Sequence, residues 1–195
     1  MSTGTRADVR RQQRLELIVA AAEDVLADTG LEGATLQEVG ERVGMSKGAL
    51  YYYVDGKDQL LALVLAEVLR AIRVDAERNL ADDASALARL RSFAHAHARI
   101  SAERAAGKLI VSHVDLLAAS AVTAALLSEH EHHARRLADA AVTAGQLRPV
   151  SPVVGAAVLF GALNTLVRSY DPQGQRTLEE LVDESFDLLL RGWLA

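Results

Sequence analysis

Apolar residues recur every three or four positions along most of this chain, the spacing that gathers them on one face of an α-helix. The first such run extends from Leu15 to Leu26 and stops near Gly30, which can cap a helix C-terminus. β-branched residues never gather into the alternating runs that strands show, and only 3 of the 195 residues are proline. Half of the residues are apolar, enough for a substantial core. We therefore predict an all-α protein.

Capping residues and helix breakers predict about nine helices. After the first helix, two short helices are expected at residues 35–43 and 46–54, with a turn at Gly44-Met45 between them. A longer helix should start near Lys57 and continue toward Leu80. Further helices are expected at about 84–105, 108–118, 120–144, 152–170 and 177–194, with Gly107 and Gly145 among the breakers and a capping box at Thr177–Glu180.

Composition removes several classes of function. The chain contains no cysteine, so disulfides, thiol catalysis and thiolate metal sites are excluded. The longest apolar stretches are shorter than the ~18 to 20 residues that span a membrane, and the polar beginning does not resemble a signal peptide. We expect a cytoplasmic protein without a cofactor. The net charge of −5 argues against general coating of polyanions, so any nucleic-acid contact must depend on local charge.

The two short helices and their glycine-containing turn match a helix-turn-helix, although other helical hairpins share this pattern. At ~100° per residue, Leu50 and Val54 lie on the buried side of the second helix. Tyr52 then points outward, while Tyr51 and Tyr53 lie on the two flanks. An outward tyrosine beside small residues suits a DNA groove. Alternatively, the flanking tyrosines merely cover the edge of a small core with their hydroxyls in water.

These segments resemble the DNA-binding signature of the TetR family of bacterial transcriptional regulators. The resemblance covers roughly residues 11–65, with departures at Gly40, Val54 and Asp55-Gly56 that leave it intact. It is carried by Thr35, Leu36 and Val39, by GMSKGALYYYV at residues 44–54 and by KDQL at residues 57–60.

The resemblance implies a role for each matching residue. Thr35 and Lys57 are expected at phosphates, while Tyr51 and Tyr53 hold the DNA backbone on either side of Tyr52. The full set expected at DNA is Thr35, Gln37, Ser46, Lys47, Gly48, Ala49, Tyr51, Tyr52, Tyr53 and Lys57. A basic arm could add phosphate or minor-groove contacts through Arg6, Arg10 and Arg11.

The resemblance also implies a three-helix DNA-binding domain at residues 1–57 and a helical domain at residues 58–195 that binds an effector and dimerises. Residues expected at the dimer interface are Gly155, Val158, Leu159, Ala162, Leu166, Phe186 and Leu189, although packing within one subunit would use the same residues. Polar residues that could line an effector pocket are Arg99, His113, Asn164 and Arg168; each could equally take a hydrogen-bonded or surface position. The segment 161–174 looks like that of relatives that sense acyl-coenzyme A compounds, although their tryptophans are missing.

A metal site and an enzymatic function are two further interpretations of the sequence. Glu129, His130 and His133 lie on one helix face and could bind a metal, but no further ligands are evident, whereas His95 and His97 point to different sides. No nucleophile–base pair or phosphate loop appears, so we expect no catalytic residues and no enzyme.

The expected function is a homodimeric, ligand-responsive repressor that binds double-stranded operator DNA and no membrane. The alternatives are a constitutive DNA-binding protein and a small helical enzyme.

Overall fold

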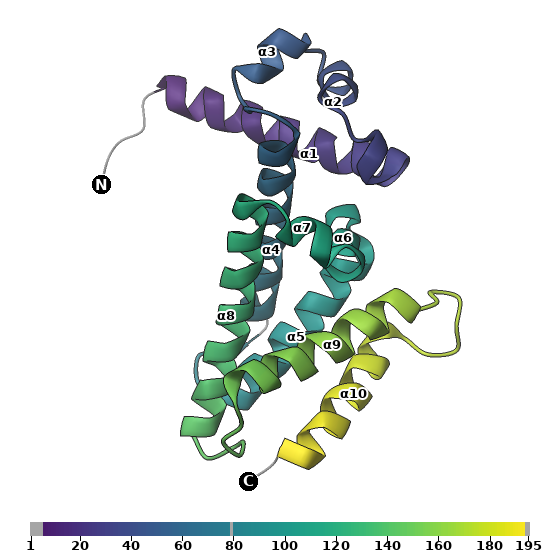
Figure 1. Cartoon of the computed structure of the whole chain (residues 1–195). Coiled ribbons are helices and arrows are strands. Elements are labelled where there is room, and N and C mark those ends of the chain that lie inside the picture. The colour runs from purple at the N-terminus through teal and green to yellow at the C-terminus, as the bar shows by residue number, and fades with distance from the viewer. Residues whose placement is uncertain (1–5, 79, 194–195) are drawn as a thin grey trace. The chain divides into compact units, whose positions relative to one another are not determined.

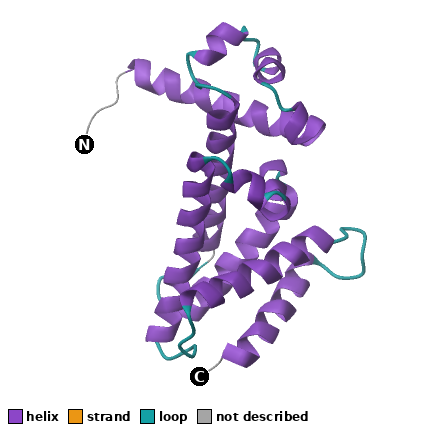
Figure 2. Ribbon diagram, viewed as in Figure 1, coloured by secondary structure: helices purple, strands orange, loops and turns teal. Residues whose placement is uncertain are grey.

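The computed structural model describes residues 6–78 and 80–193 (Figure 1). The described residues form ten α-helices, joined by turns and loops, and contain no strand (Figure 2). The prediction of an all-α protein is therefore confirmed. No helix among the described residues is long and apolar enough to cross a membrane.

The N-terminal unit, residues 1–67, contains a small helical core. Its helices are α1 (Arg6–Gly33), α2 (Leu36–Arg42), α3 (Lys47–Tyr51) and the first part of α4 (Lys57–Arg78). Their apolar faces meet in a core of fully buried side chains that includes Ile18, Val25, Val39, Leu50, Val54 and Leu65. An ion pair of 2.8 Å between Arg42 and Asp28 joins α2 to α1 at the surface of this core.

The first helix begins earlier than its apolar pattern indicates. It extends from Arg6, nine residues before Leu15, because its first turns are polar and carry no periodic apolar signal. The expected break at Gly30 is present: this residue has φ 70° and ψ −178°, which no helix accommodates, and a short helical turn follows it up to Gly33. The glycine therefore does mark the end of the regular helix.

The C-terminal unit, residues 68–195, is built around α5 (Ala86–Glu103). This helix packs against α6 (Ala105–Ser112), α8 (Ala121–Thr143), α9 (Pro152–Ser169) and α10 (Leu178–Trp193), while α7 (Val114–Ala118) lies between α6 and α8 (Figure 1). The apolar faces of these helices form one buried core, which includes Leu90, Ala94, Ala98, Val111, Leu147, Leu159, Leu163, Val182 and Phe186.

Two expectations in this unit need correction. The single helix expected at residues 108–118 is two helices, because His113 leaves the helical region with φ −134° and ψ 34°. Gly107 does not end a helix but lies inside α6, and the break is at Arg104. A Cβ atom on Gly107 would lie 2.6 Å from the Cα atom of Ser101, so the glycine allows α6 to pack closely against the end of α5.

The chain divides between Glu67 and Val68, so α4 contributes its first half to one unit and its second half to the other. The domain boundary expected from the sequence lies at the first residue of this helix. Tight turns give way there to long aliphatic helices, but the apolar face of α4 continues to serve the N-terminal core for two more turns through Leu60, Val64 and Leu65.

Candidate DNA-binding surface and effector site

The turn between α2 and α3 is fixed by backbone hydrogen bonds. Gly44 has φ 65°, and its N–H donates to Glu41 O at 3.2 Å while the Met45 N–H donates to Gly40 O at 2.8 Å. This pair of bonds is a Schellman motif, which needs a residue that tolerates the left-handed region. A Cβ atom on Gly40 would lie only 2.9 Å from Met45 O, so both glycines are needed for a turn this tight.

Helix α3 is shorter than the helix expected at residues 46–54, because it ends at Tyr51 and Tyr52 is its C-cap. Ser46 caps the helix by accepting a hydrogen bond from Ala49 N at 3.2 Å. Leu50 and Val54 are buried in the N-terminal core, whereas the side chain of Tyr52 is 71% exposed. Lys47, Gly48 and Ala49 are also exposed, so the solvent-facing side of α3 carries two small residues and a lysine in addition to the Tyr52 ring.

The three consecutive tyrosines have different surroundings. Tyr53 is partly buried and meets Tyr52 edge to face, with ring centroids 5.1 Å apart. Tyr51 is about half exposed, and the ammonium of Lys47 lies 6.0 Å from its ring centroid. Tyr53 thus supports the orientation of Tyr52 from one side, while Tyr51 and Lys47 form a separate pair on the other.

Two residues expected at phosphates already have partners within the protein. The Thr35 hydroxyl oxygen caps α2 by accepting from Glu38 N at 3.2 Å, which leaves its own proton available to a phosphate. The Lys57 ammonium donates to Leu31 O at 2.6 Å and contacts Glu32 O at 3.4 Å. Lys57 therefore donates hydrogen bonds to backbone carbonyls near the end of α1, which lack partners within the helix. Gln37 is exposed and donates to Glu41 at 3.0 Å.

The basic residues near the beginning of the chain lie in a helix. Arg6, Arg10 and Arg11 are exposed and belong to the first turns of α1, so the expectation of a separate arm is wrong for the described residues. Arg6 and Arg10 share one face because they are four residues apart. Side chains fixed to a helix can reach phosphates, but they cannot follow a minor groove as an extended arm does.

The four residues expected in an effector pocket are not brought together. Arg99 forms ion pairs with Asp75 at 2.7 Å and Glu103 at 2.8 Å. Arg168 donates to Val111 O at 2.9 Å and so caps the end of α6, and His113 is exposed at the start of α7. Only Asn164 reaches a buried polar cluster.

This polar cluster joins α5, α8 and α9 in the interior of the C-terminal unit. The Nε2 atom of His97 lies 3.0 Å from Oδ1 of Asn164, and its Nδ1 atom lies 3.1 Å from Nε2 of His130. Both histidine side chains are buried. Burial lowers the pKa of His97 from 6.5 to about 4, although the hydrogen bond to Asn164 acts in the opposite direction. Burial also lowers the pKa of His130, with His97, His133 and Arg73 adding to this effect. Both imidazoles are therefore neutral near pH 7.

Aromatic rings surround the two histidines. The Phe93 and Phe160 ring centroids lie 5.2 and 5.4 Å from that of His130, and Phe160 lies 5.2 Å from His97. Sequence reasoning missed the pairing of His97 with His130 because the two residues come from different helices. The only signal was a polar residue among the alanines of α5, at a position that the apolar periodicity assigns to the core.

The histidines and glutamates of segment 129–133 do not gather into a metal site with other ligands. No group of three or more metal-ligating side chains occurs among the residues that the structure describes. His130 turns inward to His97, while Glu129 is exposed and lies 3.5 Å from Arg73.

The residues expected at a dimer interface fall into two groups. Leu159 and Phe186 are buried in the core of their own unit, whereas Val158 is 47% exposed. Gly155, Val158 and Leu189 line an apolar hollow of about 250 Å³ between α9 and α10. Ala162 and Leu166 line a wider groove further along these helices. Three other large apolar residues on α9 and α10 are more than half exposed: Val153, Val154 and Leu188.

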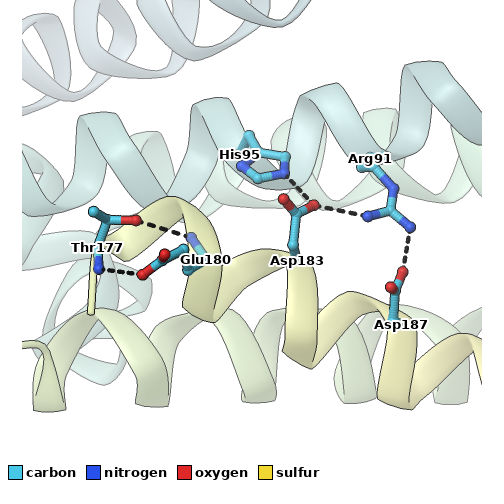
Figure 3. Close-up of polar contacts among 6 residues, drawn as sticks. All are labelled: Arg91, His95, Thr177, Glu180, Asp183 and Asp187. Carbon is cyan, nitrogen blue, oxygen red and sulfur yellow. Dashed lines mark hydrogen bonds and ion pairs between the residues drawn. The ribbon is translucent and has the colours of Figure 1, made fainter. Parts of the chain in front are cut away.

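Ion pairs fasten α10 to α5 beside this surface (Figure 3). Arg91 of α5 reaches both Asp183, at 2.7 Å, and Asp187, and His95 lies 2.9 Å from Asp183. Burial alone would raise the pKa of Asp183, but the hydrogen bonds from His95 and Arg91 lower it. The capping box expected at the start of α10 is present, since Glu180 N donates to Thr177 Oγ1 and Thr177 N donates to Glu180.

Comparison with family models gives two adjacent matches. The model of bacterial regulatory proteins of the tetR family matches residues 18–64, and that of the tetracyclin repressor-like C-terminal domain matches residues 83–193, more than half of the chain. Among curated proteins, the transcriptional repressor AcnR of Corynebacterium diphtheriae is 36% identical over 81 residues. That match spans 41% of this chain and 40% of AcnR.

Solved structures share the fold over most of the chain. PfmR, a TetR family transcriptional regulator from Thermus thermophilus, is 26% identical with a TM-score of 0.66, covering 89% of this chain and 97% of PfmR. AibR, solved in complex with isovaleryl coenzyme A and operator DNA, is 23% identical with a TM-score of 0.72, covering 91% of this chain and 98% of AibR. At that identity, the likeness to AibR concerns the fold alone.

Proposed function

Because the chain belongs to the TetR family of bacterial transcriptional regulators, we propose that it is a homodimeric repressor released from its operator by a small apolar or amphipathic effector. The observation that carries the proposal is the outer face of α3, where Tyr52 projects beside Gly48 and Ala49. A tightly fixed turn and a buried Leu50 hold this face in one orientation, as reading base edges requires.

On this surface some residues contact the edges of the bases and others contact the phosphates. Gln37, Lys47 and Tyr52 lie nearest the base edges, with Gly48 and Ala49 allowing close approach. Thr35, Ser46, Tyr51 and Tyr53 contact the phosphates on either side. Lys57 contributes in a different way, because its ammonium is bound to the end of α1 and holds α4 against that helix. The arginines of α1 add positive charge, which strengthens binding without selecting a sequence.

Dimerisation places two such surfaces on one DNA molecule. The exposed valines and Leu188 of α9 and α10 form an apolar surface, and an interface of two helices from each subunit would cover them. A twofold dimer reads a palindromic site whose half-sites are about one DNA turn apart, ~34 to 36 Å. The dimer interface thus sets the spacing at which the two α3 helices meet the DNA.

Release by an effector follows from a shift between two conformations. An effector that binds the C-terminal unit better in a form with wrongly spaced α3 helices lowers operator affinity, and such coupling is worth about 1 to 3 kcal/mol. An acyl-coenzyme A compound is one candidate, in keeping with the likeness of segment 161–174 and with the isovaleryl coenzyme A in the AibR complex.

The test is selection of genomic DNA fragments by the purified protein. We expect enrichment of one palindrome, and a footprint of the dimer over both half-sites. Fragments retained without a shared sequence would refute sequence-specific regulation. An operator complex that no metabolite extract dissociates would instead favour constitutive binding.

A further inference from the structure

The buried histidine pair ends in an atom without a partner. His130 Nδ1 is buried and makes no hydrogen bond, although the other three ring nitrogens of the pair are all engaged. Ser101, one turn after His97 on α5, also carries a buried hydroxyl without a partner. Each such group costs about 1 to 3 kcal/mol compared with a satisfied one, so a core built only for stability would not retain them.

The direction of the hydrogen bonds defines the chemistry of the free atom. Oδ1 of Asn164 is an acceptor, so the proton of the His97 ring lies on Nε2 and its Nδ1 has a lone pair. That lone pair must accept from His130, whose single proton is therefore on Nε2. His130 Nδ1 is consequently an acceptor with no donor within hydrogen-bond distance among the described residues.

The surroundings select against charge. Phe93 and Phe160 pack around the His130 ring, and the low pKa of both histidines keeps them neutral near pH 7. A carboxylate or phosphate would meet a lone pair instead of a cation and would lose its hydration. An aromatic or aliphatic body, by contrast, gains contacts with the phenylalanine rings. Phe160 is only partly buried, so this ring of the cluster reaches solvent.

We propose that Nδ1 of His130 anchors an uncharged ligand that donates one hydroxyl to it from an apolar or aromatic body. The proposal rests on the proposed function, since this ligand would be the effector or a part of it. The hydroxyl satisfies the acceptor at the end of the chain Asn164–His97–His130, and the body lies against Phe93 and Phe160. An acyl-coenzyme A could place only an uncharged portion of its structure here.

Binding of matched probes tests the proposal with the full chain. By titration calorimetry at pH 7.5, 4-propylphenol should bind and its methyl ether should bind at least about tenfold more weakly. 4-Propylbenzoate, which is charged at this pH, should not bind. His130→Phe keeps a ring but removes the acceptor, so the variant should lose the preference for the phenol over the ether. His132→Phe, at an exposed position on the same helix, should keep it. Equal affinity for phenol and ether, no binding of the phenol at millimolar concentration, or a preference that survives in His130→Phe would overturn the proposal.

Nitrogen NMR of the parent protein tests the same atom if His130→Phe does not fold. The Nδ1 resonance of His130 should lie in the range of an unprotonated imidazole nitrogen and should shift when 4-propylphenol is added. A protonated Nδ1 would refute the assignment of an acceptor. Neither measurement involves DNA, so a protein that binds the phenol but no operator refutes only the repressor function. A protein that binds its operator but not the phenol refutes only this inference.

Discussion

Acid should destabilise this protein through His97. Folding buries the imidazole and lowers its pKa from 6.5 to about 4. Between these two pH values the unfolded chain binds a proton at His97 that the folded state does not bind. The stability that depends on neutral His97 is therefore fully present above pH 6.5, falls as the pH is lowered through 6.5, and stops falling below about pH 4. At 1.36 kcal/mol for each pKa unit, the loss between pH 7.5 and pH 5 is about 2 kcal/mol from this residue. His130 adds to the loss, because its pKa is lowered too.

The assay is urea unfolding at both pH values and at one fixed protein concentration, since a dimer makes stability depend on concentration. His97→Gln keeps hydrogen-bonding groups but cannot titrate, so its free energy of unfolding should change by about 2 kcal/mol less than that of the parent over this range. The control is His132→Gln, at an exposed position on α8, which should keep the pH dependence of the parent. If His97→Gln also keeps it in full, the buried neutral histidine does not explain acid sensitivity.

Three further substitutions test the packing and the dimer. Gly107→Ala should lower the free energy of unfolding by about 1 to 3 kcal/mol because its Cβ would meet the α5 backbone, whereas Gly48→Ala, in open space, should not; thermal unfolding compares the two. Val158→Glu should dissociate the proposed dimer in sedimentation experiments, while Val122→Glu, at a similarly exposed position on α8, should leave it intact. Lys57→Ala should cost about 1 kcal/mol of stability by freeing the α1 carbonyls. It should weaken specific and non-specific DNA binding alike, and unchanged stability would show that its contact with α1 is unimportant.

Local chemistry in the sequence was enough to predict the turn between α2 and α3 and the buried and exposed sides of the residues that follow it. Capping residues, a left-handed glycine and helical periodicity all act within a few positions, so Leu50, Val54 and Tyr52 lie on the sides expected. The polar first turns of α1 could not be assigned in this way, because a helix without an apolar face has no periodic signal. The contact of Lys57 with Leu31 could not be predicted from local patterns either, because the two residues are 26 positions apart.

The C-terminal unit shows what periodicity leaves out. His97 and His130 meet only because α5 and α8 pack together, and nothing in either helix specifies its partner. Arg99 and Arg168 looked like pocket residues because they interrupt apolar runs, yet both side chains reach partners at the edge of the unit. Gly107 was interpreted as a breaker, although its role is to let two helices approach. Polar residues and glycines within helices thus need their neighbours in space before they can be assigned.

The measurement that bears most directly on the account is operator binding by Tyr52→Ala. Tyr52 is 71% exposed and supports no core, so its removal should leave stability unchanged. By fluorescence anisotropy, affinity for the selected palindrome should fall by at least about tenfold, equivalent to ~1.4 kcal/mol, while affinity for random DNA should change much less. Val114→Ala, an exposed substitution on α7, should bind both as the parent does. If Tyr52→Ala binds the palindrome as tightly as the parent, the outer face of α3 does not read the operator.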